Sequence, residues 1–261
     1  MVNCVIFSKD RPMQLDATLR SIKSNAQGFF DSIKVLFKPT NEFEIGYDIV
    51  KMEHPDVFFI REQNFREDVD FMLRGDFTCF LLDDDIIFRK ILFRKEILNL
   101  FSDPALSCFS FRLGLNIDYC YSRNEPNVLS SFQDREEFIR WEWRKEQWDF
   151  GYPLSLTSHL FRTKDLKRWT NGLDFKNPNE YEDRLQARLN EVPPIMMAYK
   201  KSRILGVPIN LVNETHHNRH GLSNFHSPID LNKRFLLGQR IKLNIGPNIH
   251  AAQTEIAFSF I

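Results

Sequence analysis

Apolar and polar residues alternate between two spacings over the first 113 positions. Short apolar runs typical of buried strands occupy residues 4–7, 33–37, 57–60, 77–82 and 106–111. Between these runs, apolar residues at helical spacing predict helices at 13–24, 43–53, 65–73 and 91–101. Repeated strand–helix units of this length predict an α/β fold with a mostly parallel central sheet flanked by helices, Rossmann-like in this half of the chain.

The pattern changes after residue 113 without a linker rich in glycine, serine or proline. A polar and aromatic stretch at 114–150 is followed by a predicted strand at 156–162, a helix at 164–169, a helix that begins near Asn177, and a strand at 207–212. We expect one domain, in which residues 1–113 form a ligand-binding half. Residues 114–261 then complete the sheet, build the other wall of a crevice and form a C-terminal tail.

Three carboxylates, Asp83, Asp84 and Asp85, stand directly after the apolar run at 77–82. Such a cluster loses solvation and repels itself unless a cation or several donors compensate it. Oxygen ligands of this kind suit Mg²⁺ or Mn²⁺, whereas a surface loop with three solvated aspartates is the plainer alternative. Ligands of parallel sheets bind beyond the carboxyl ends of the strands. By that rule residues 8–12, the segment 61–66 and the aspartates face one crevice, which favours a functional site.

Two further groups lie downstream. Glu182 and Asp183 follow a helix start at which Asn177 or Asn179 can cap and Pro178 suits the first turn. Either carboxylate can point into a cleft, although Glu182 three residues after Asn179 is also an ordinary capping arrangement. The segment 213–221 concentrates histidines. One of them is expected to complete a site begun by the aspartates, although a flexible, solvated polar loop explains each single histidine equally well.

Composition narrows the class of protein. Lysine plus arginine and aspartate plus glutamate each total 35, so the formal net charge is zero and nothing favours nucleic acid as a partner. The four cysteines are scattered without a CxxC pair, which favours a reduced, cytoplasmic setting. No stretch reaches the roughly 18 apolar residues of a membrane span. The apolar stretches 231–243 and 256–261 fit ordinary core, a homodimer contact or a membrane-proximal edge.

The order of these motifs resembles that of GT-A fold glycosyltransferases. The opening at 5–12 followed by an amphipathic helix is similar to family 2-like members. The Asp-x-Asp of Asp83 and Asp85, the Glu182–Asp183 pair at a helix start and the histidine-rich loop come in the same sequence. The resemblance covers roughly residues 3–220. It implies a metal-dependent enzyme whose site is this crevice. Such an enzyme moves a sugar from a UDP- or GDP-type nucleotide-sugar donor to a hydroxyl of a glycan or glycolipid acceptor, as in polysaccharide biosynthesis.

The resemblance also assigns residues. It implies donor contacts from the strand end and the neighbouring loops: Phe7, Ser8, Arg11, Asn64, Asp83 and Asp84. It places the metal, Mn²⁺ or Mg²⁺, on Asp83 and Asp85, with His216 or His217 as a further ligand. Asp183 or Glu182 would be the general base of a transfer that inverts the sugar. The shortened spacing between Asp183 and Leu185 leaves the choice of base open, and retention is not excluded.

Four aromatic or acidic residues are candidate acceptor contacts: Trp141, Trp148, Asp149 and Tyr152. Core packing or a dimer face explains the tryptophans equally well. Two other functions compete with glycosyl transfer. One is a metal-dependent nucleotidyltransferase or phosphohydrolase using the same aspartates, and the other is a non-catalytic module that binds a nucleotide or glycan.

Overall fold

A nine-stranded sheet runs through the chain in the order β3-β2-β1-β4-β11-β6-β12-β10-β9. The computed structural model describes residues 1–212, 219 and 226–261. The strands of the large sheet are β1 (Val2–Lys9), β2 (Ser32–Lys38), β3 (Phe58–Arg61), β4 (Phe77–Leu82), β6 (Leu106–Ser110), β9 (Gln133–Arg135), β10 (Phe138–Glu142), β11 (His159–Arg162) and β12 (Ile195–Tyr199). Two small sheets pair β5 (Asp85–Ile87) with β13 (Ile204–Gly206) and β7 (Tyr119–Cys120) with β8 (Glu125–Pro126).

Most strands of the large sheet point the same way. β3, β2, β1 and β4 are mutually parallel, and β12 is parallel to β6. Only β11 and β10 pair antiparallel to both of their neighbours in the sheet. This agrees with the α/β fold and mostly parallel sheet predicted from the sequence. β11 lies between β4 and β6, so the sheet joins segments from before and after residue 113.

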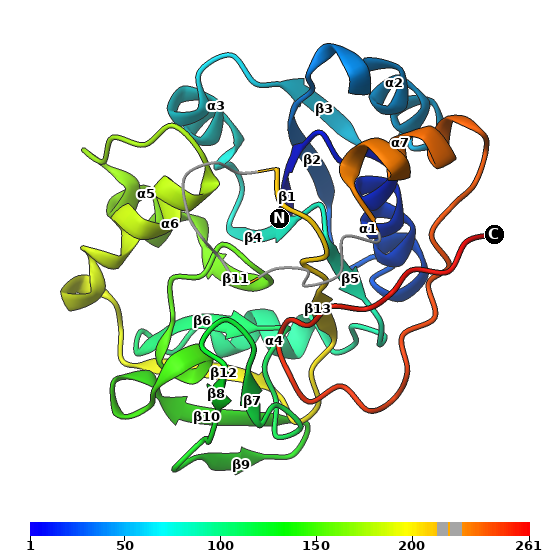
Figure 1. Cartoon of the computed structure of the whole chain (residues 1–261). Helices are drawn as coiled ribbons and strands as arrows, with labels where there is room; N and C mark the ends of the chain where they lie inside the picture. Colours follow the sequence, from blue (N-terminus) through cyan, green and yellow to red (C-terminus); the bar gives the residue numbers. More distant parts are fainter. Residues whose placement is uncertain (213–218, 220–225) are drawn as a thin grey trace.

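Helices cover both faces of this sheet (Figure 1). The helices are α1 (Pro12–Asn25), α2 (Glu44–Glu53), α3 (Phe65–Met72), α4 (Arg94–Leu100), α5 (Thr163–Thr170), α6 (Pro178–Gln186) and α7 (Pro228–Leu236). Apolar residues of α1, α2, α4 and α7 pack with Cys4 and Ile6 of β1 in one buried cluster. Those of α3, α5 and α6 pack with Val5 and Phe7 in another. The two-residue period of β1 therefore supplies both layers of the core.

One predicted strand is wrong. Residues 207–212 form no strand; the chain instead makes β12 and the short β13 before them. Pro208 has no N–H to donate to a ladder. The Asn210 backbone carbonyl accepts a hydrogen bond from Arg11, and the Asn210 side-chain amide donates one to the His226 carbonyl at 2.8 Å. These polar partners replace a strand neighbour.

The C-terminal tail packs against the rest of the domain. Ile256, Phe258 and Phe260 are partly buried against the cluster that contains α1 and α7. Gln253 pairs with Gly206 of β13 through an isolated bridge. Within the part of the chain that the structure describes, no helix combines the length and apolar character needed to cross a membrane.

Candidate active site

A cleft of about 900 Å³ lies at the carboxyl ends of β1, β4 and β6. Phe7, Ser8 and Arg11 reach it from the end of β1 and the turn that follows, and the three aspartates from the end of β4. The opposite wall comes from the second half of the chain, including the turn at 148–152 and helix α6. The sequence predicted that residues 8–12, the segment 61–66 and the aspartates face one crevice. Residues from all three segments line this cleft.

The three aspartates form a reversal between two strands. β4 ends at Leu82, and the Asp83 N–H still donates to the Phe7 carbonyl at 3.1 Å, so the pairing with β1 extends one residue further. β5 then begins at Asp85, which lies opposite Gly206 of β13. The Thr18 hydroxyl of α1 donates to the Asp83 carbonyl at 2.8 Å. Backbone pairing to β1 on one side and to β13 on the other fixes the position of this segment. All three aspartate side chains are buried.

Arg11 neutralises two of the aspartates. Its Nη1 lies 3.0 Å from Asp83 Oδ1 and 3.0 Å from Asp84 Oδ2, and its Nη2 donates to the Asn210 carbonyl. Burial disfavours the charge of Arg11, yet Asp83 and Asp84 raise its pKa above the usual value. Burial raises the pKa of Asp83 to about 6 against the opposing effect of Arg11. The guanidinium thus supplies the compensating cation for these two carboxylates in this structure.

Asp85 is held differently. Its Oδ2 accepts the Leu82 N–H at 3.0 Å and the Ser158 hydroxyl at 3.3 Å, whereas Oδ1 is buried with no hydrogen-bond partner among the residues that the structure describes. Burial, helped by the charge of Asp84, raises the pKa of Asp85 to about 8. A Cβ on Gly206 would be in van der Waals contact with Oδ1, at 3.4 Å, so the glycine leaves this side of the oxygen without a side-chain neighbour from β13. An unpaired carboxylate oxygen of this kind fits a hard divalent cation.

Helix α6 brings a second pair of carboxylates to the cleft. The Asn177 side chain caps its start by accepting the Glu180 N–H at 3.0 Å, and Pro178 occupies the first turn as predicted. Glu182 Oε2 accepts the Leu156 N–H at 2.6 Å. Burial raises the pKa of Glu182, although the Leu156 N–H and Arg112 oppose this. Asp183 lines the same cleft.

The turn at 148–151 presents aromatic and acidic side chains to the cleft. Trp148, Asp149 and Tyr152 line it, and Trp148 is 39% exposed with a left-handed backbone (φ 50°). The Arg123 guanidinium stands over the Trp148 ring, 5.7 Å from its centroid. Asp149 is buried and pairs with Arg112. This wall therefore offers an aromatic face and a buried ion pair to a ligand.

Comparisons with known proteins found a curated relative by sequence and solved structures with a similar fold. The Bifunctional glycosyltransferase pgtA of Dictyostelium discoideum is 27% identical over 210 residues, which cover 69% of this chain and 27% of that protein. The crystal structure of S. aureus TarS superposes with a TM-score of 0.51 at 15% identity, over 78% of this chain and 36% of that chain. TarS 1-349 in complex with UDP-GlcNAc gives 0.52 at 15% identity, over 91% and 65%. No protein-family model matches the sequence.

The chain resembles glycosyltransferases in sequence and in fold. This confirms the GT-A-like resemblance inferred from the order of the motifs. The chain spans only about a quarter of the length of the Dictyostelium relative, at 27%. The likeness to TarS, at 15% identity, is one of fold.

The structure brings together most of the candidate site residues named from the sequence. The cleft is lined by Phe7, Ser8, Arg11, Asp83, Asp84, Asp85, Trp148, Asp149, Tyr152, Glu182 and Asp183. Two others lie elsewhere. Asn64 caps helix α3 by accepting the Glu67 N–H, and Trp141 is buried with its indole N–H bonded to the Phe150 carbonyl at 2.9 Å. His216 and His217 lie outside the described residues.

Arg112 is a cleft residue that the sequence reasoning missed. It lines the cleft and follows β6, which the sequence predicted as a strand at 106–111. Because ligands bind beyond the carboxyl ends of strands, the end of this predicted strand already pointed to Arg112. Ser158, which donates to Asp85, and Gly206, opposite Asp85, had no comparable sequence signal.

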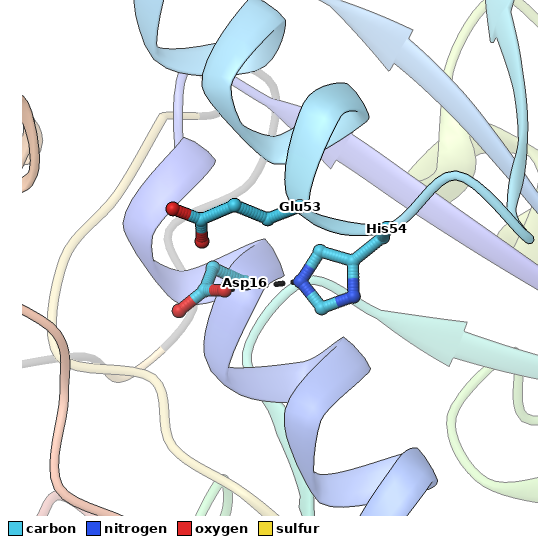
Figure 2. Close-up of side chains that lie close together, drawn as sticks. All are labelled: Asp16, Glu53 and His54. Carbon is cyan, nitrogen blue, oxygen red and sulfur yellow. Dashed lines mark hydrogen bonds and ion pairs between the residues drawn. The ribbon is translucent and has the colours of Figure 1, made fainter.

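A separate group of side chains has the spacing of a metal site. One ligand atom from each of Asp16, Glu53 and His54 lies within 4.8 Å of the others, between helices α1 and α2 (Figure 2). His54 Nε2 lies 3.0 Å from Asp16 Oδ1, while Arg20 donates to Asp16 Oδ2 at 2.8 Å and Arg240 donates to Glu53. These partners already compensate the carboxylates, and none of the three residues lines the cleft. The group therefore ties α1 and α2 to the C-terminal segment.

Proposed function

We propose that this chain is a glycosyltransferase that moves a sugar from a nucleotide-sugar donor to a hydroxyl acceptor. The observation that carries the proposal is a single cleft that contains both Asp85, with its unpaired carboxylate oxygen, and the Glu182–Asp183 pair of α6. Glycosyl transfer needs a group that supports departure of a nucleoside diphosphate and a base for the acceptor hydroxyl. The likeness to glycosyltransferases supports the proposal that this cleft supplies both groups, the one that assists the leaving diphosphate and the base.

The donor's nucleoside fits the β1 side of the cleft. Phe7, Leu36 and Phe65 form an apolar wall there, with the Phe7 and Phe65 ring centroids 5.2 Å apart. Asp83 adjoins this wall, because its N–H bonds to the Phe7 carbonyl. Its carboxylate, held by Arg11, is placed to accept a hydrogen bond from a ribose hydroxyl. We assign the nucleoside to Phe7, Ser8, Phe65 and Asp83 on these grounds.

A divalent cation, Mn²⁺ or Mg²⁺, fits Asp85 best among the three aspartates. Arg11 already satisfies one oxygen each of Asp83 and Asp84, whereas Asp85 Oδ1 has no hydrogen-bond partner. Asp83 remains the second proposed ligand. When bound with the donor, the ion would act as a Lewis acid that stabilises the charge of the departing diphosphate.

Asp183 is the proposed general base. Glu182 is held by the Leu156 backbone and the Ser155 hydroxyl, and its raised pKa reflects burial. A carboxylate fixed in that way orients neighbouring groups. Asp183, the next residue of α6, lines the cleft and is proposed to accept the proton of the acceptor hydroxyl. A base on the face opposite the leaving group would invert the sugar. Trp148 and Tyr152 are the proposed acceptor contacts.

Donor binding and cleavage test this proposal. Thermal shift with UDP, GDP, UDP-GlcNAc and GDP-mannose, each with and without Mn²⁺, should show metal-dependent stabilisation by one nucleotide series. A ligand at a hundredfold excess over its Kd stabilises by about 2.7 kcal/mol. Absence of any nucleotide response in the presence of metal would rule out the transferase. Chromatography of the products separates the alternatives: nucleoside diphosphate indicates glycosyl transfer to water or acceptor, and nucleoside monophosphate indicates a phosphohydrolase.

A further inference from the structure

A buried ion pair spans the floor of the cleft. Arg112 Nη2 donates to Asp149 Oδ1 at 3.0 Å, and both residues line the cleft although each is largely buried, at 6% exposure. Arg112 follows β6, whereas Asp149 belongs to the turn after the left-handed Trp148. Two segments that are distant in the sequence therefore deliver opposite charges to one place in the site.

The hydrogen bonding of this pair is incomplete. Asp149 Oδ2 accepts a bond from the Asn127 amide at 3.2 Å. Within the described part of the chain, Arg112 Nε and Asn127 Oδ1 are buried with no hydrogen-bond partner. A buried ion pair seldom stabilises a fold more than apolar residues of the same volume would, and each unsatisfied group adds to its cost. Binding of a ligand, which can supply the missing hydrogen bonds, explains why an incompletely bonded network lines a cleft that solutes can enter.

The position of Arg112 relates the pair to the reacting centre. Arg112 lines the same cleft as Asp85 and Glu182. It therefore shares that cleft with the proposed cation ligand and with the helix turn that carries the proposed base. A transferred sugar must occupy the space between those two groups, because its anomeric carbon leaves the diphosphate and meets the acceptor.

We propose that Arg112 and Asp149 together bind hydroxyls of the transferred sugar and select a neutral hexose or N-acetylhexosamine over a sugar acid; this rests on the proposed glycosyltransferase function. Neighbouring hydroxyls each donate and accept hydrogen bonds, so a guanidinium and a carboxylate side by side match both roles. Asp149 also neutralises Arg112. The pair thus gives a sugar carboxylate no uncompensated cation to bind.

The first experiment compares UDP with UDP-glucose, and GDP with GDP-mannose, by calorimetry in the presence of Mn²⁺. In the pair that binds, Arg112→Lys and Asp149→Asn should each reduce the affinity gained from the sugar by roughly 10- to 100-fold. The affinity for the nucleoside diphosphate alone should stay unchanged. The matched control is Arg162→Lys, which alters another buried arginine, paired with Asp165 and outside the cleft lining. Equal losses for the nucleotide and its sugar in both variants would overturn the proposal.

The second experiment uses charge. UDP-glucuronate carries a carboxylate where UDP-glucose has a hydroxymethyl group, so the ratio of their affinities reports the sugar subsite. The wild-type chain should favour UDP-glucose, and Asp149→Asn should shift the ratio at least about tenfold towards UDP-glucuronate, because Arg112 then lacks its counter-charge. A purely structural ion pair would leave this ratio unchanged, which would overturn the proposal.

A third measurement needs no variant. If Arg112→Lys and Asp149→Asn do not fold, deoxy-sugar analogues of the bound donor are titrated into the wild-type chain. Loss of affinity on removing one or two hydroxyls supports the assignment, and equal binding of every analogue overturns it. If the wild-type chain binds no nucleotide at all, the proposed function fails, which is a different outcome from either result.

Discussion

Glu182 accepts the backbone N–H of Leu156 at 2.6 Å through its Oε2. This bond fixes the side chain of Glu182 against the loop before β11 and separates its role from that of the next residue along the helix. We expect Asp183→Asn to lower donor turnover by about 10²- to 10⁴-fold with little change in donor Kd, because the general base is lost. The measurement is release of nucleoside diphosphate in single-turnover reactions, alongside calorimetry.

Glu182→Gln is the matched variant for that test. A glutamine oxygen can still accept the Leu156 N–H, so turnover should fall less than in Asp183→Asn. The reverse order, with turnover surviving Asp183→Asn and falling in Glu182→Gln, would move the base to Glu182.

Arg11→Met should destabilise the fold. Removal of the guanidinium leaves Asp83 and Asp84 buried beside each other without their cation, which costs about 3–5 kcal/mol for a broken buried pair. Urea unfolding at pH 8 measures it. The loss should shrink as the pH falls towards about 6. Burial raises the pKa of Asp83 to about 6 against the lowering effect of Arg11, so without Arg11 this pKa lies higher, and the carboxyl of the variant is protonated first and no longer needs a cation.

Arg61→Met controls for the loss of an arginine as such. Arg61 pairs with Glu44 on the surface, where its side chain is 50% exposed. An exposed pair contributes little to stability because water screens it, so this variant should unfold close to the wild-type chain. Equal losses in the two variants would show that Arg11 does not compensate the aspartates.

Gly206→Ala should weaken metal-dependent nucleotide binding while changing stability little. The added methyl would lie in ordinary van der Waals contact with Asp85 Oδ1, at 3.4 Å, and so would occupy space beside the proposed cation ligand; its contact with the Gln253 Cβ, at 3.2 Å, would be tighter. Nucleotide titrations with and without Mn²⁺ measure the effect. Gly246→Ala is the control, since no atom lies within 4 Å of its Cβ position. Unchanged metal-dependent binding in Gly206→Ala would contradict the assignment of Asp85.

His159 should make the fold sensitive to acid. Burial, with the nearby charge of Arg112, lowers the pKa of this imidazole to about 3. An unfolded histidine titrates near 6.5, so between about pH 6.5 and 3 the unfolded state binds the extra proton and stability falls as the pH drops. From pH 6.5 to 5 this contributes roughly 2 kcal/mol.

The comparison variant is His159→Asn, whose amide can replace the contact between His159 Nδ1 and the Pro153 carbonyl, 3.3 Å apart. Urea unfolding across that pH range should show a shallower acid loss in this variant. His250→Asn, at a histidine whose side chain is 65% exposed, should follow the wild-type slope. Parallel slopes for His159→Asn and the wild-type chain would show that His159 titrates normally.

The sequence alone determined the elements with strong periodicity. The α/β alternation, the end of a buried strand at Asp83 and a helix that begins near Asn177 all follow from local patterns: apolar runs, adjacent carboxylates and a cap followed by proline. The gathering of strand ends could be predicted as well, because parallel strands share one carboxyl edge. The same rule, applied to the strand predicted at 106–111, would also have pointed to Arg112.

Tertiary structure decided what each side chain meets. Trp141 and Trp148 belong to one aromatic stretch, yet one is buried with its indole bonded to Phe150 and the other lines the cleft. The aspartates look alike in the sequence, but Arg11 satisfies Asp83 and Asp84 and leaves Asp85 Oδ1 unpaired. The reason is physical: these partners come from residues far away along the chain, and only the packing of the folded sheet brings them within hydrogen-bonding distance.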